Sequence, residues 1–159
     1  MSGQPSSGGP VFVVGMNGSG TTMMLDCLNG HSRLFGFRRE TLIIPHYIAR
    51  AARSGDLRED VTFLRLWDDF RGEQVFRYLN KRRTPPLPED WREQPRTLGT
   101  IVDETFLHFA RRDNKQRWCE KTPMHAQHIT SLSGLFPEAR LAPGGVISLR
   151  QNLILCFSG

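Results

Sequence analysis

The chain has 159 residues, of which 38% are apolar and 23% are charged, and its formal net charge at pH 7 is +5. This length and composition are typical of one globular domain with a buried core, and they exclude a disordered or fibrous protein. The basic excess comes from scattered residues without interleaved aromatics, and no apolar stretch approaches the roughly 20 residues that span a bilayer, so neither nucleic acid nor a membrane is the predicted partner.

The first predicted elements are a strand, a glycine-rich loop and a helix. Residues 1–10 form a flexible lead without the features of a signal peptide, which favours a cytoplasmic location. The apolar run at 11–14 is typical of a strand buried on both faces of a parallel sheet. A helix is expected from Thr21 to Gly30, capped by the hydroxyl of Ser19, Thr21 or Thr22. A strand, loop and helix in this order present backbone N–H groups to an anion.

The rest of the chain alternates helices with short strands. Helices are expected at residues 40–52, at two patterns within 57–80 separated near Gly72, at 97–112 and at 127–135. In the first pattern of 57–80, Val61, Leu64 and Trp67 are predicted to face the core. Strands are expected at 34–37, 117–120 and from 139 to 141. The alternation predicts an α/β sandwich with a mostly parallel sheet.

The loop at 15–20 has the glycine spacing of a phosphate-binding P-loop, but not its lysine. Thr21 and Thr22 stand where nucleotide hydrolases have lysine and then serine or threonine. That lysine neutralises the outer phosphates during transfer, so its absence argues against ATP or GTP hydrolysis. A tight turn that binds no ligand is the plainer alternative.

Three further segments accompany the loop sequence GSGTT at 18–22. They read ETLIIP at 40–45, WCEKTPMH at 118–125 and LFPEARL at 135–141. Together the four segments resemble bacterial sulfotransferases related to the tyrosylprotein sulfotransferases, and the resemblance covers residues 11–141. It implies a P-loop-like three-layer α/β sandwich that transfers a sulfuryl group from 3′-phosphoadenosine 5′-phosphosulfate. The acceptor would be a hydroxyl or amine of a small molecule or peptide, with no prediction of oligomeric state.

The resemblance also implies roles for individual residues. Glu40 matches the family's general base. A carboxylate can take the proton of an attacking hydroxyl. Lys121 matches the family's lysine, whose ammonium stabilises charge on the oxygen between phosphorus and sulfur. Without the resemblance, the simpler interpretation of Glu40 is an acidic residue at a helix start, and that of Lys121 is a surface lysine. The 5′-phosphosulfate would bind the loop, at Asn17, Gly18, Ser19, Gly20, Thr21 and Thr22.

Two segments depart from the family pattern. Gly18 stands where the family usually has arginine or lysine, so positive charge would come from Lys121 and from Arg38 or Arg39. Pro143, Gly144 and Gly145 are expected to interrupt the last strand, and residues 142–159 lack the family's 3′-phosphate motif. These residues are predicted to be a divergent tail of a C-terminally truncated member, incomplete in its fold. The alternative function is a non-catalytic remnant or pseudoenzyme with at most weak binding of phosphorylated ligands.

The cysteines and histidines do not indicate a metal site. Cys27, Cys119 and Cys156 are widely spaced and odd in number, which predicts free thiols. His125 and His128 lie near Cys119, but no fourth ligand follows at a zinc-binding spacing. No metal is therefore predicted, and both histidines are expected at the surface.

Overall fold

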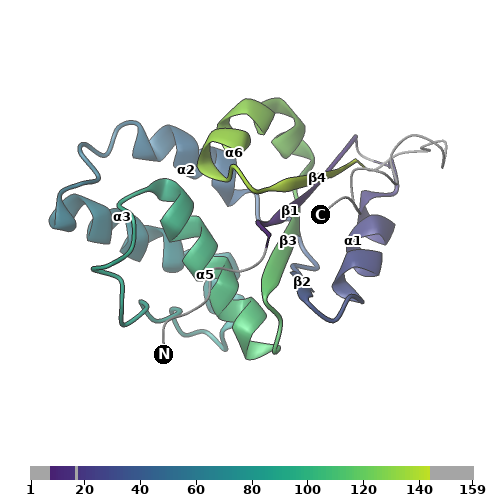
Figure 1. Ribbon diagram of the computed structural model, residues 1–159, viewed down its shortest axis with the longest axis horizontal. Coiled ribbons are helices and arrows are strands. Elements are labelled where there is room, and N and C mark those ends of the chain that lie inside the picture. Colours follow the sequence, from purple (N-terminus) through teal and green to yellow (C-terminus); the bar gives the residue numbers. More distant parts are fainter. Residues whose placement is uncertain (1–7, 17, 144–159) are drawn as a thin grey trace. The chain divides into compact units, whose positions relative to one another are not determined.

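The computed structural model describes residues 8–16 and 18–143 (Figure 1). The chain divides into two compact units, one made of residues 1–42 and 110–159 and the other of residues 43–109. The first unit contains the sheet, and the second unit is helical.

A four-stranded parallel sheet organises the first unit. Its strand order is β2-β3-β1-β4, with bounds Leu34–Gly36 for β2, Arg117–Lys121 for β3, Val11–Val14 for β1 and Arg140–Pro143 for β4. The inner strand β1 is buried at all four positions and pairs with β3 on one side and β4 on the other. This confirms the predicted α/β fold with a parallel sheet.

Helices cover both faces of this sheet because successive strand residues point to opposite sides. Val11 and Val13 pack with Leu25 of α1 (Thr21–Asn29). Phe12 points the other way, and its ring contacts those of Trp118 and Phe136, at centroid distances of 5.4 and 5.6 Å. That side is covered by the 3₁₀ helix η1 (Pro123–His128) and by α6 (Ile129–Leu135). The result is a helix–sheet–helix sandwich.

One local expectation in this unit is wrong. No side chain caps α1: Gly20 is its N-cap at φ 77°, and the Ser19 hydroxyl donates instead to the Met16 carbonyl oxygen at 2.5 Å. The sharp turn requires the left-handed backbone conformation at the N-cap position, which glycine adopts, and Ser19 therefore stays in the loop before the helix. Strand β4 includes Pro143, which pairs with Val14, and the expected interruption stays a prediction because residues 144–159 lie outside the described residues. A proline is tolerated there because β4 is an edge strand within the described residues.

The residues just before β1 are hydrogen-bonded to the two strands beside it. Arg117 donates from Nε to the Gly9 carbonyl oxygen at 2.8 Å, and the Arg140 amide donates to the Pro10 carbonyl oxygen at 2.8 Å. Residues 8–10 are therefore joined to β3 and β4. The flexible lead and the divergent tail stay predictions, because residues 1–7 and 144–159 lie outside the described residues.

The second unit consists of helices packed around aromatic side chains. Their bounds are Ile43–Ala51 for α2, Asp60–Arg71 for α3, Gln74–Leu79 for α4 and Leu98–Arg112 for α5, whose last residues belong to the first unit. In α3 the buried residues are Phe63, Leu66, Trp67 and Phe70, which share one helical face. Val61 is 70% exposed, so its predicted core position is wrong. It lies beside Asp60 in the first turn, off that face.

Candidate active site

The candidate site lies at the carboxyl ends of β1, β2 and β3. In a parallel sheet these ends meet at one edge, so the segments that follow the three strands come together. They carry the glycine-rich loop after β1, Glu40 after β2, and Lys121 at the end of β3. All of these residues belong to the first unit.

The glycine-rich loop turns sharply into α1. Gly18 and Gly20 have φ values of 80° and 77°, a region that only glycine adopts without strain. Apart from the glycine itself and its two chain neighbours, no described residue has an atom within 4 Å of the position that a Cβ would take at Gly18 or Gly20, so the loop is open there. The first N–H groups of α1 have no partner within the helix and can serve an anion. Asn17 lies outside the described residues.

The two threonines after the loop differ in exposure. Thr21 is almost fully buried, with 5% of its surface exposed, whereas Thr22 is exposed. Of the two side chains, that of Thr22 is therefore the more accessible to a ligand.

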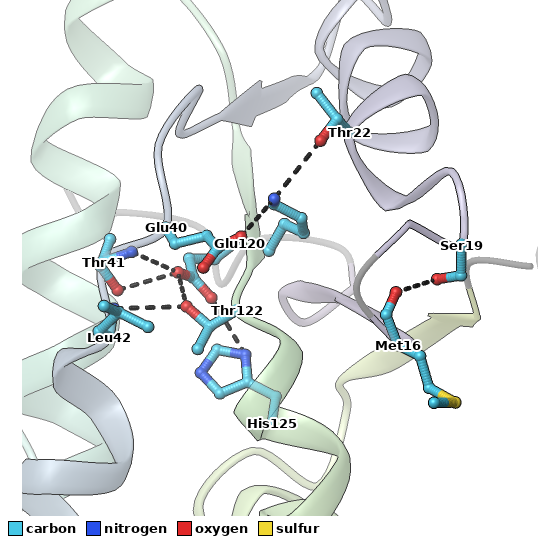
Figure 2. A network of polar contacts seen from close by, with 10 residues as sticks. Met16, Ser19, Thr22, Glu40, Thr41, Leu42, Glu120, Thr122 and His125 are labelled. Carbon is cyan, nitrogen blue, oxygen red and sulfur yellow. Dashed lines mark hydrogen bonds and ion pairs between the residues drawn. The ribbon is translucent and has the colours of Figure 1, made fainter.

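Lys121 connects Glu40 with the start of α1. Its Nζ lies 2.5 Å from Oε1 of Glu40 and 3.5 Å from Oγ1 of Thr22 (Figure 2). The Lys121 side chain is only 12% exposed, and that of Glu40 is 32% exposed. The strand therefore supplies the positive charge that the loop itself lacks. Arg38 and Arg39 are exposed on the segment between β2 and Glu40.

The residue before Lys121 in β3, Glu120, has a buried carboxylate. Glu120 is fully buried, and its Oε1 accepts hydrogen bonds from the Thr41 amide at 3.0 Å and the Thr41 hydroxyl at 2.9 Å. The Thr122 hydroxyl donates to the same oxygen at 2.7 Å. The Thr122 oxygen in turn accepts from the Leu42 amide at 3.4 Å. These bonds join the segment after β2 to the end of β3 (Figure 2).

His125 is buried against the same carboxylate, so its predicted surface position is wrong. Its Nδ1 lies 3.1 Å from Oε2 of Glu120, and its ring meets that of Phe12 edge-on. Residue 125 lies in η1, which turns the imidazole under the sheet instead of outward. Burial lowers the pKa of His125 to about 4 and raises the pKa of Glu120. The imidazole is therefore neutral at pH 7, and neither of its ring nitrogens has a hydrogen-bond partner among the described residues.

The remaining candidate residues do not form a metal centre in the structure. Within residues 8–16 and 18–143, no group of three His, Cys, Asp or Glu side chains could hold a metal ion. Cys27 and Cys119 are free thiols, whereas Cys156 lies outside this range. No helix in the same part of the chain is long and apolar enough to cross a membrane.

Comparison with known proteins identifies the family. The model of the Sulfotransferase family matches residues 10–142, which is most of the chain. The chain belongs to the sulfotransferase family. The match includes the loop after β1, Glu40, and the end of β3, so the whole candidate site of this sulfotransferase-family protein lies inside it. Searches of curated proteins and of solved structures give no match.

Four side chains of this network were not predicted as site residues, those of Thr41, Glu120, Thr122 and His125. A signal for the network is present at the end of β3, where continued alternation would place Glu120 and the following Thr122 on one side and Lys121 on the other. Two polar side chains on the buried face of a strand require hydrogen-bond partners. Thr41, next to the predicted base, is such a partner.

Proposed function

We propose that this protein transfers a sulfuryl group from 3′-phosphoadenosine 5′-phosphosulfate to a hydroxyl or amine. Its family supports sulfuryl transfer in general. The observation that carries the proposal is the position of Lys121, whose ammonium group lies between the carboxylate of Glu40 and the hydroxyl of Thr22. One cation therefore contacts a candidate base and the start of a candidate anion-binding helix.

The loop after β1 suits the phosphosulfate of the donor. Gly18 and Gly20 leave the loop open, and the helix N-terminus favours negative charge by roughly 0.3–1 kcal/mol at an exposed site. Thr22 adds a hydroxyl, and Lys121 adds a full charge beside it. Lysine is well suited to phosphate contacts as a compact point charge.

The proposed reaction is a direct displacement at sulfur. The oxygen or nitrogen of the acceptor attacks sulfur, and the bond from sulfur to the bridging phosphate oxygen breaks with its electron pair. The products are the sulfated acceptor and 3′-phosphoadenosine 5′-phosphate. Glu40 takes the proton of the acceptor, and Lys121 stabilises the negative charge that develops on the bridging oxygen. The Glu40–Lys121 contact keeps the two groups together at the loop.

A transfer assay tests this proposal. The protein is incubated with donor labelled in its sulfate and with a panel of a tyrosine peptide, a phenol, a sugar and an amine. We expect labelled product from at least one acceptor, and a loss of about 10²- to 10⁴-fold in rate for Glu40→Gln, the usual contribution of a general base. Glu138→Gln is the matched control, because Glu138 is exposed and lies in the turn before β4.

Two results would contradict the proposal. Equal rates for Glu40→Gln and Glu138→Gln would exclude Glu40 as the base. Binding of 3′-phosphoadenosine 5′-phosphate without transfer to any acceptor would favour a non-catalytic protein that retains the nucleotide site.

A further inference from the structure

We infer that Glu120 is a positioning residue whose buried carboxylate holds residues 40–42 against β3 and thereby fixes Glu40 beside Lys121. This inference rests on the proposed function, because it concerns the placement of the proposed base. It assigns Glu120 no contact with donor or acceptor.

The hydrogen bonds and the ion pair that join residues 40–42 to residues 120–122 form a continuous set of contacts, which we call the seam. Glu40 contacts Lys121, and Thr41 contacts Glu120 through both its amide and its hydroxyl. Leu42 donates its amide to Thr122. Three consecutive residues after β2 are thus each joined to one of three consecutive residues at the end of β3. If residues 40–42 moved together so that Glu40 left Lys121, the hydrogen bonds between Thr41 and Glu120 would break.

The backbone of this segment needs support to keep its conformation. Leu42 has a φ of 59°, a left-handed conformation that is unfavourable for a residue with a side chain. Such a conformation persists only where the surroundings hold it. The bonds from the Thr41 amide to Glu120 and from the Leu42 amide to Thr122 provide this support on the N-terminal side of the Leu42 Cα.

A carboxylate is costly at a fully buried position unless several donors surround it. Oε1 of Glu120 accepts three hydrogen bonds, whereas Oε2 lies 3.1 Å from Nδ1 of His125 but has no hydrogen-bond partner among the described residues. An apolar side chain could fill this volume at no cost in desolvation, but it could not bind the Thr41 amide and hydroxyl together. The carboxylate is therefore suited to fixing geometry rather than to adding stability.

Hydrogen exchange at the Thr41 and Leu42 amides tests the seam directly, using the full chain and mass spectrometry. Thr41→Val keeps the side-chain shape but removes one donor, and we expect exchange at these amides to rise about 2- to 10-fold. Glu120→Ala removes the acceptor, and a rise of at least 10-fold is expected. Glu120→Gln retains an acceptor oxygen and should restore slow exchange.

A matched variant separates local release from general loss of stability. Thr105 is also buried and hydrogen-bonded, accepting from Trp67 Nε1 at 3.2 Å and donating to the Ile101 carbonyl oxygen at 2.7 Å. Thr105→Val should leave exchange at Thr41 and Leu42 unchanged. If it accelerates these amides as much as Thr41→Val does, the seam has no specific role and the inference is wrong.

The kinetic consequence distinguishes positioning from donor binding. A misplaced base lowers turnover without weakening the donor site, because the loop after β1 is untouched. For Thr41→Val we expect kcat to fall about 10-fold or more, with the Kd of 3′-phosphoadenosine 5′-phosphate unchanged within twofold. An equal loss in both quantities would overturn the inference. If the native protein transfers no sulfate, the proposed function fails, whereas the exchange result still decides whether the seam exists.

Discussion

The Lys121 ammonium lies 2.5 Å from the Glu40 carboxylate, although the two residues are 81 positions apart in the chain. The same ammonium reaches Thr22 in the first turn of α1. A phosphate-binding loop of nucleotide hydrolases carries its own lysine, whereas here the neighbouring strand β3 supplies the cation. The anion site and the candidate base therefore share one charge, and this sharing underlies the proposed sulfuryl transfer.

Gly20 is expected to be essential to the shape of the loop. Gly20→Ala places a side chain at φ 77° and should lower the free energy of unfolding by about 1–2 kcal/mol. Gly134→Ala is the control, because Gly134 lies within α6 with open space at its Cβ position and should gain about 0.5–1 kcal/mol. Urea titrations of both variants measure these changes. A gain in stability for Gly20→Ala would contradict the observed loop conformation.

The two described cysteines should differ sharply in reactivity. Burial raises the pKa of Cys119 to about 12, whereas Cys27 is exposed on α1. Since only the thiolate is nucleophilic, iodoacetamide at pH 8 should modify Cys27 in the folded protein and Cys119 only in denaturant. Mass spectrometry of the digested protein separates the two sites. Similar rates at both cysteines in the folded protein would show that β3 is not buried as described.

Much of the fold could be predicted from the sequence because its signals are local. The apolar run at β1 and the helical pattern of α5 depend on neighbouring residues, and both elements occur where expected. The hydroxyl cap of α1 and the core position of Val61 were wrong, because each depended on the residue at which the helix begins. A pattern of apolar residues locates a helix better than it locates the first turn.

The site was predictable in a different way. Glu40 and Lys121 are predicted by resemblance to a family, because the sequence does not show that the two strands they follow are neighbours in the sheet. Burial of His125 was missed because a histidine in a polar segment gives no sign of its side chain's direction. The Thr41–Glu120 bonds depend on the parallel pairing of β2 with β3, which the sequence does not specify.

Acidification should weaken the protein through His125. Its pKa falls from 6.5 to about 4 on folding, so between these pH values the unfolded chain binds more protons at this group and stability decreases as pH falls. The loss amounts to roughly 1–3 kcal/mol by pH 4. Glu120 acts in the opposite direction, because burial raises its pKa. The test therefore compares two variants that both carry Glu120→Gln, which removes the opposing titration of Glu120. One of the two also carries His125→Asn.

Urea titrations between pH 4 and pH 7 measure this effect. The protein that retains His125 should lose stability more steeply on acidification than the protein with His125→Asn. Parallel pH profiles would contradict the neutral, buried state of the imidazole.

Calorimetric titration of the full chain with 3′-phosphoadenosine 5′-phosphate tests the central claim most directly. If Lys121 supplies the charge of the donor site, Lys121→Ala should weaken binding about 10- to 100-fold, the loss expected for a hydrogen bond to a charged group. Lys81→Ala, at an exposed lysine of the second unit, should bind like the native protein. No detectable binding by the folded native protein, or equal affinity for the two lysine variants, would contradict the proposed donor site.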